Sequence, residues 1–130
     1  MDPVVLDTDV ASREIRGTLN PDLAQELSMR EGVLTFVTVG ELLRGAFRAN
    51  WGERRTRELE QWISQFPQLD SEPEVSRAWA GIVATRENAG RPIKPNDAWI
   101  AACCVNASFP LATLNRKHFE GIEGLELLQA

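Results

Sequence analysis

Short runs of β-branched and aliphatic residues alternate along the chain with longer segments of helical periodicity. Pro3–Leu6 and Val33–Val39 are the clearest strand candidates, and neither alternates cleanly between apolar and polar residues. Strands that are apolar on both faces are typical of a parallel sheet covered by helices. The weaker strand candidates are Phe66–Leu69, Pro110–Leu114 and Leu125–Leu128.

Helical patterns fill the intervals between these strands. Pro21–Met29 follows Asn20, which is a favourable N-cap, and has proline at its first position. In Glu53–Phe66 the apolar residues recur at helical spacing. A Ser-Glu-Pro-Glu capping box at 71–74 predicts the start of a further helix. The remaining predicted helices are Glu41–Asn50 and Asn96–Asn106.

The resulting order, β-α-β-α-α-β-α-α-β-β, predicts an α/β fold. Strands that alternate with helices favour a three-layer α/β/α sandwich with a mostly parallel central sheet. The chain has 130 residues, which fits a single domain over 1–130 that can bury a core. We find no internal repeat, low-complexity tract or linker in the sequence.

Composition points to a globular cytoplasmic protein. Hydrophobic residues make up 43% of the chain and charged residues 25%, both ordinary values. No run reaches the roughly 18 apolar residues of a membrane-spanning helix, and the start of the chain lacks the features of a signal peptide. Cys103 and Cys104 are adjacent in an apolar run, so we expect buried reduced thiols and neither a disulfide nor a zinc site.

The charge pattern limits the possible chemistry. The single histidine, His118, argues against a histidine-built metal site. The formal net charge of −5 is unusual for a nucleic-acid binder, which is commonly basic. Carboxylates that bind a cation would account for part of this negative charge. Positive charge is locally dense at Arg44, Arg48, Arg54, Arg55 and Arg57.

Three acidic residues follow predicted strands or loops at one edge of the sheet. Asp7 ends the first strand, Glu41 follows the second, and Asp97 opens the helix after a proline-rich loop. Open parallel sheets place their sites beyond the carboxyl ends of the strands, so we expect these residues to converge. Asn115 follows a later strand, and Asp9 shares the strand parity of Asp7 if that strand continues.

Clustered carboxylates suit a hard divalent cation. Mg²⁺ or Mn²⁺ takes oxygen ligands, relieves the mutual repulsion and neutralises charge on a phosphodiester. Each residue also has a structural interpretation. Glu41 would complete a capping box with Thr38, and Asp97 would interact with a helix dipole. Asp7 would end a strand. The residues alone leave both interpretations open.

Four segments together resemble a known family. They are Val4-Val5-Leu6-Asp7-Thr8-Asp9, Thr38-Val39-Gly40-Glu41-Leu42-Leu43-Arg44-Gly45, Pro95-Asn96-Asp97-Ala98-Trp99-Ile100-Ala101-Ala102 and Ala112-Thr113-Leu114-Asn115-Arg116-Lys117-His118-Phe119. In order, spacing and total length they resemble the landmarks of PIN-domain proteins, and most closely the VapC-type toxins of bacterial toxin–antitoxin pairs.

This resemblance implies a PIN fold and a Mg²⁺-dependent endoribonuclease with an acidic site at Asp7, Glu41 and Asp97. It also implies an RNA substrate, inhibition by a small VapB-like antitoxin, and commonly a homodimer. Asn115 takes a fourth position that is often aspartate in the family. Because asparagine is neutral and a weaker ligand, the number of bound ions stays open.

Three arginines are candidate RNA contacts. Arg44 and Arg48 lie one helical turn apart and follow Glu41, and Arg116 follows Asn115. Basic side chains near a nuclease site are suited to hold phosphates. The structural alternative is that they are solvated helix-face residues with some ion pairing.

Other functions remain as alternatives. The Asp7-Thr8-Asp9 motif also resembles that of haloacid-dehalogenase phosphatases, but the later Gly-Asp-x-x-x-Asp element of that family is absent from the sequence. A receiver domain would need a phosphorylatable aspartate and a late lysine, and Asp70 and Lys117 fit those positions poorly. A non-catalytic PIN-like binding module is the remaining alternative.

Overall fold

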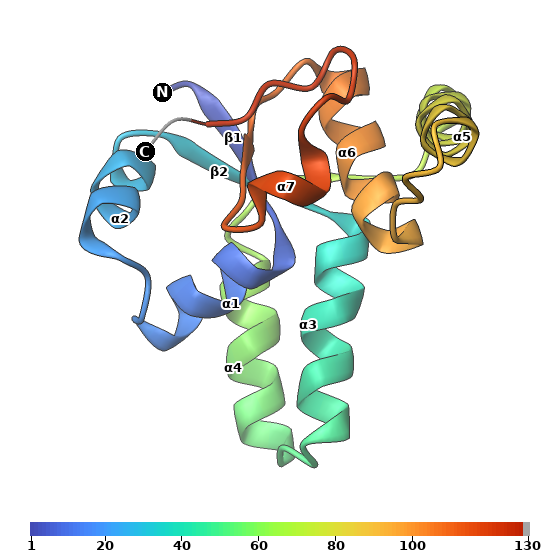
Figure 1. Ribbon diagram of the computed structural model, residues 1–130. Helices are drawn as coiled ribbons and strands as arrows, with labels where there is room; N and C mark the ends of the chain where they lie inside the picture. The colour runs from blue at the N-terminus through green and yellow to red at the C-terminus, as the bar shows by residue number, and fades with distance from the viewer. Residues whose placement is uncertain (129–130) are drawn as a thin grey trace.

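A computed structural model describes residues 1–128 and contains a four-stranded, all-parallel sheet with helices around it (Figure 1). This confirms the predicted α/β fold with a parallel central sheet. The strands are β1 (Pro3–Leu6), β2 (Glu31–Thr35), β3 (Gln68–Leu69) and β4 (Leu111–Ala112). The helices are α1 (Thr8–Arg16), α2 (Pro21–Ser28), α3 (Phe36–Arg48), α4 (Glu53–Ile63), α5 (Pro73–Asn88), α6 (Pro95–Ala107) and α7 (Arg116–Phe119).

The first strand lies in the interior of the sheet. The strand order is β3-β2-β1-β4, so β1 pairs with β2 on one side and with β4 on the other. Because all of these pairs are parallel, the carboxyl ends of the strands lie at the same edge. The residues that follow β1, β2 and β4 are therefore brought close together there.

Both faces of the sheet are covered by apolar side chains. Val4 and Leu6 belong to one buried cluster and Val5 to another, as the two-residue period of a strand requires. The first cluster includes apolar residues of α1, α3 and α4, and the second includes residues of α6 and α7. Figure 1 shows α3 and α4 as a pair extending away from the sheet, with α5 packed beside α6.

The second strand is shorter than the sequence pattern indicates. We expected it over Val33–Val39, but β2 ends at Thr35 and α3 begins at Phe36. The Thr35 side chain accepts a hydrogen bond from the backbone N–H of Thr38, at 3.2 Å, and so caps the helix. Residues 36–39, which are apolar except for Thr38, form the first turn of this helix. Burial of the helix face, and not strand pairing, accounts for their hydrophobicity.

Two helices were absent from the predicted order. Asp7 does not continue β1 but caps α1, which begins at Thr8. Gly17 ends this helix with a φ of 68°, a left-handed conformation that glycine adopts readily. The other unpredicted helix, α7, has only four residues and gives too little periodicity for recognition from sequence.

Several predicted boundaries change as well. The helix expected from a capping box at 71–74 is present, but α5 is capped by Glu72 without a side-chain hydrogen bond. The predicted strand Leu125–Leu128 is reduced to an isolated bridge between Leu127 and Leu111. By contrast, the cap of α2 is confirmed, since the Asn20 side chain accepts from the backbone N–H of Leu23 at 2.9 Å.

Helix α6 is the most deeply buried helix of the fold. Six of its residues are buried: Ala98, Ile100, Ala101, Ala102, Cys103 and Cys104. Both cysteines are free thiols, as the sequence predicted. Within residues 1–128, no helix combines the length and apolar character that a membrane crossing needs.

The cap of α3 yields a test of how this helix is positioned. Thr35→Ala should be about 1 kcal/mol less stable than Thr35→Ser, because serine keeps the hydroxyl that accepts from the Thr38 N–H and both variants lose the buried methyl group. The measurement is urea unfolding at equilibrium. Equal stabilities of the two variants would show that the cap contributes nothing.

Candidate functional site

A pocket with a volume of about 710 Å³ opens at the carboxyl edge of the sheet. Its lining includes four carboxylates, and we call it the acidic pocket. The carboxylates belong to Asp7, Asp9, Glu41 and Asp97. Asn115, Lys94 and His118 also line it. The structure thus brings together side chains from the ends of β1 and β4 and from α1, α3 and α6.

Asp7 is the most deeply buried of these acids, with 5% of its surface exposed. One carboxylate oxygen, Oδ1, accepts from the backbone N–H of Val10 at 2.9 Å. The other, Oδ2, accepts from the Thr113 hydroxyl at 2.5 Å. Thr113 is fixed in turn, because its hydroxyl oxygen accepts from the Asn115 N–H at 3.0 Å. Both Asp7 oxygens therefore have protein partners.

Burial raises the pKa of Asp7 above the ordinary value of 3.8. The negative charges of Asp9 and Asp97 raise this pKa further, whereas the hydrogen bonds from Thr113 and Val10 lower it. Burial is the largest effect and gives the net direction. Ionisation of Asp7 is therefore less favourable in the folded protein than in the unfolded chain, and positive charge added to the pocket would favour it.

Glu41 lies on α3 and is held by neutral donors. The Thr8 hydroxyl donates to Oε1 at 2.5 Å, and the Asn96 side-chain amide donates to Oε2 at 3.2 Å. Because Thr8 gives its one proton to Glu41, the Thr38 hydroxyl must donate to Thr8 across their 3.1 Å contact. The proposed capping box of Thr38 and Glu41 is wrong, since Thr35 caps this helix instead.

Asp97 pairs with the only histidine. Its Oδ2 lies 3.3 Å from Nδ1 of His118, and the two side chains are 24% and 48% exposed. Asp97 is in the first turn of α6, where the helix dipole also favours a negative charge. His118 comes from α7, so this contact connects two helices at the rim of the acidic pocket.

The remaining candidates occupy different positions. Asn115 lines the pocket immediately before α7. Asp9 also lines it, but from the first turn of α1 and not from a continued strand, and its Oδ1 lies 3.4 Å from Nε of Arg13. Two oxygen-bearing side chains thus flank the three predicted acids.

The candidate RNA contacts from sequence lie away from this lining. Arg44 and Arg48 are exposed on α3 and do not line the acidic pocket. Arg116 donates through Nη1 to the backbone carbonyl of Leu128, at 3.1 Å. That hydrogen bond gives Arg116 a structural function in holding the end of the described chain against α7.

The acidic pocket fits a hard divalent cation, because each of its four candidate ligands offers an oxygen atom. These ligands are Asp7, Glu41, Asp97 and Asn115. However, within residues 1–128 no three acidic, histidine or cysteine side chains meet closely enough to form a ready-made cage. Glu41 is turned toward Thr8 and Asn96, and Asp97 toward His118. A shared ion requires these two carboxylates to turn from their present partners.

The structure adds residues that the sequence did not indicate. Thr8, Thr113 and Asn96 donate to the predicted acids, and His118 pairs with one of them. Each of the first three lies within two residues of a candidate acid or of Asn115. Their hydroxyl and amide side chains, so close in sequence to the acidic motifs, could have indicated hydrogen-bond donors to the acids. The partner of His118 depends on tertiary structure.

Comparison with known proteins places this arrangement in a family. The family described as PIN domain matches residues 4–125. Ribonuclease VapC1 of Haemophilus influenzae (strain R2866) is 31% identical over 94 residues, which is 72% of this chain and 70% of the relative. The tRNA(fMet)-specific endonuclease VapC of Shigella flexneri is 26% identical over 93% of this chain and 92% of its own length.

A solved structure shares the fold over the full length. It is that of VapBC-5 from Mycobacterium tuberculosis, described as a member of the VapBC family of toxin–antitoxin systems. The TM-score is 0.72 at 25% sequence identity, and the match covers 100% of both chains.

The buried charge of Asp7 predicts a stability change. In the absence of divalent cations, Asp7→Asn should be more stable than the wild type at pH 7, because it removes a buried negative charge and keeps an oxygen that caps α1. Because the pKa of Asp7 is higher in the folded state than in the unfolded state, ionisation of Asp7 lowers the free energy of unfolding as the pH rises from the unfolded-state pKa to the folded-state pKa. The gap between the variants should therefore shrink as pH falls toward the unfolded-state value of about 3.9.

The measurement is urea unfolding in EDTA at several pH values. Asp70→Asn is the matched control, because Asp70 is exposed and lies outside the acidic pocket. A wild type more stable than Asp7→Asn at pH 7 would show that Asp7 has a mainly structural function.

Proposed function

Because this chain belongs to the PIN-domain family and to its VapC group, we propose that it is a metal-dependent endoribonuclease and the toxin of a toxin–antitoxin pair. The observation that carries the proposal is the acidic pocket, in which Asp7, Glu41 and Asp97 line one cavity at the carboxyl edge of a parallel sheet. Carboxylates in this position suit phosphodiester hydrolysis with Mg²⁺ or, as a substitute, Mn²⁺.

The acids divide into one fixed group and two adjustable ones. Asp7 is buried and its two oxygens have protein donors, so it offers a ligand whose position is set before any ion arrives. Glu41 and Asp97 are partly exposed and would close on the ion from α3 and α6. Asn115 would contribute a neutral amide oxygen at the same rim.

A bound divalent ion supplies positive charge that favours deprotonation of water and offsets charge developing on the phosphodiester. The protein's own contribution is to orient the oxygens. Thr113 holds the Asp7 carboxylate, and Thr8 and Asn96 hold Glu41. His118 adds a proton-bearing side chain beside Asp97, 3.3 Å away.

RNA is the substrate that the relatives support, since they are called ribonuclease and tRNA-specific endonuclease. The solved VapBC-5 structure supports a VapB-like antitoxin partner. We propose that the antitoxin places an arginine or lysine in the acidic pocket, where it would offset the carboxylate charge and compete with the metal. A homodimer of the chain is part of the same proposal.

Metal binding should raise the melting temperature. A ligand that binds only the folded state stabilises it by mass action, by about 2.7 kcal/mol at a concentration one hundred times its Kd. Millimolar Mn²⁺ should therefore raise the melting temperature of the wild type and of Asp70→Asn equally, but that of Asp97→Asn less. Thermal unfolding followed by circular dichroism measures this. Equal shifts in all three proteins would contradict the assignment of Asp97 as a ligand.

Cleavage should depend on the same acids. Asp7→Asn, Glu41→Gln and Asp97→Asn should each lower kcat/KM by at least about 100-fold, because a ligand to a catalytic metal supports several kcal/mol of charge stabilisation. The assay follows Mg²⁺-dependent cleavage of total RNA and of purified tRNA. In cells, expression of the wild type should arrest growth, and co-expression of the antitoxin should restore it.

Controls separate the nuclease from its biological context. Asp70→Asn should cleave RNA and arrest growth like the wild type. Cleavage in vitro without growth arrest in a host whose RNA is cut would refute the toxin function alone. A folded protein that binds RNA but cleaves none, with Mg²⁺ or Mn²⁺, would instead support a non-catalytic binding module.

A further inference from the structure

A second, smaller cavity adjoins the acidic pocket and has the opposite charge. Its volume is about 270 Å³, and it shares Lys94, Asp97 and His118 with the acidic pocket. We call it the basic pocket. Its positively charged lining residues are Arg86, Arg91, Lys94 and Lys117. Asp97, the one acid in this lining, already faces His118.

None of these four cations has an acidic partner among the described residues. No carboxylate lies within ion-pair distance of them, and Arg86 bonds to backbone carbonyls instead. Elsewhere on the surface, Arg13, Arg30 and Arg54 have carboxylate partners. What distinguishes the basic pocket is that four cations line one cavity. A group of unpaired cations in a cavity is suited to bind an anion.

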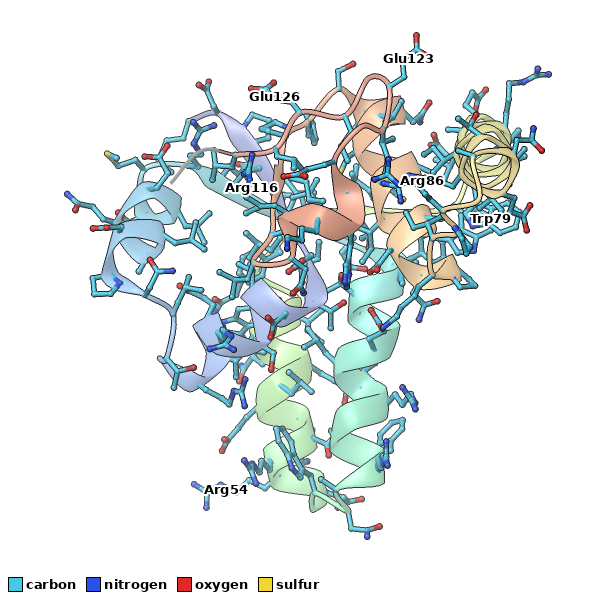
Figure 2. All side chains as sticks on the ribbon, in the orientation of Figure 1. Arg54, Trp79, Arg86, Arg116, Glu123 and Glu126 are labelled. Atoms are coloured by element: carbon cyan, nitrogen blue, oxygen red, sulfur yellow. The ribbon has the colours of Figure 1, made fainter. Side chains whose placement is uncertain are left out.

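The backbone around the basic pocket is well fixed. Arg86 donates through Nη2 to the carbonyl oxygens of His118 and Glu120, at 3.1 and 3.0 Å, and so connects α5 to α7. Figure 2 shows the Arg86 side chain extending from α5 in this direction. Gly90 turns with a φ of 69°, and the Arg91 N–H donates to the Arg86 carbonyl at 2.9 Å. The backbone of Arg91, just after the end of α5, is therefore held in a defined position.

The start of α6 adds to the positive potential. Lys94 is the N-cap of this helix, and it makes no side-chain hydrogen bond to the helix. The partial positive charge at the start of α6 therefore faces Asp97 in the first turn but is not offset by a capping side chain. Lys94 lies at the wall between the two cavities, whereas Arg86, Arg91 and Lys117 line the basic pocket alone.

A polyanionic substrate needs such a surface. The chain carries a net charge of −5, and the acidic pocket repels a phosphate chain except where a metal ion offsets its charge. We propose that the basic pocket binds a backbone phosphate of the RNA, adjacent to the scissile phosphate in the acidic pocket. This inference rests on the proposed ribonuclease function. The inference predicts that the RNA extends from the acidic pocket over the start of α6, so that only nucleotides on one side of the cleavage site reach the basic pocket.

The test removes two exposed cations without touching the acidic pocket. In Arg91→Gln/Lys117→Gln, KM for a long RNA should rise about 5-fold while kcat changes by less than about 2-fold, as expected for a solvent-exposed phosphate contact. The matched control is Arg54→Gln/Arg57→Gln on α4, which removes the same charge at the far end of the α3–α4 pair (Figure 2). Its KM should match that of the wild type at equal salt.

RNA binding gives a second measurement that is independent of cleavage. In EDTA, the slope of log affinity against log salt should fall by about 0.7 in the basic-pocket variant, because each phosphate that a protein neutralises on a single strand contributes about that much. Substrates shortened from one side of the cleavage site should abolish the KM difference between wild type and variant. Shortening from the other side should leave that difference unchanged.

The outcomes distinguish this inference from the proposed function. Normal cleavage with unchanged KM and salt slope in the basic-pocket variant would overturn the inference and leave the nuclease intact. Weaker antitoxin affinity with unchanged RNA binding would also overturn it, since the pocket would then receive an acidic segment of the partner protein. If the wild type cleaves no RNA but the variant still binds RNA more weakly, the phosphate site stands and the nuclease proposal fails.

Discussion

The burial of one negative charge at the end of the central strand is the constraint on which this site depends. Asp7 lies where β1 ends between β2 and β4, and its side chain is almost completely shielded from solvent. Hydrogen bonds from α1 and from the residues after β4 partly replace the missing water. The remaining desolvation favours any arrangement that brings positive charge into the pocket, whether from an ion or from a partner's side chain.

The neighbouring acids, Glu41 and Asp97, have partners that carry no fixed positive charge. Glu41 accepts from neutral hydroxyl and amide groups, and Asp97 faces an imidazole. These contacts hold the carboxylates apart without adding a permanent charge to the interior. Positive charge is concentrated instead next to the pocket, around Arg91 and Lys117. The surface is thus divided into a part suited to cations and a part suited to phosphates.

The sequence predicted what depends on strand composition and on local motifs. Apolar strands and their acidic ends indicated the parallel sheet and the group of acids, because parallel strands end at a common edge. Errors arose where one residue served two patterns. Thr38 and Glu41 imitate a capping box, although Thr35 is the cap. The first strand ends at Leu6 as predicted, but the helix that Asp7 caps was not predicted, because Asp7-Thr8-Asp9 is also compatible with a continued strand.

Contacts between distant segments were beyond the reach of sequence patterns. The pairing of Asp97 with His118 and the bonds from Arg86 to α7 depend on how α5, α6 and α7 pack. No periodicity encodes such contacts. The basic pocket was missed for the same reason, because its cations are scattered between residues 86 and 117 and meet only in the folded chain.

The adjacent thiols of α6 have a consequence for following the motions of this protein. Burial raises the pKa of Cys103 to about 11 and raises that of Cys104 still further. Both thiols therefore stay protonated and unreactive at neutral pH while the core is closed. Because the first turn of the same helix carries Asp97, alkylation of these cysteines reports the opening of an element that carries part of the site. The rate at which a thiol reagent modifies these cysteines therefore measures local unfolding of α6 without an introduced probe.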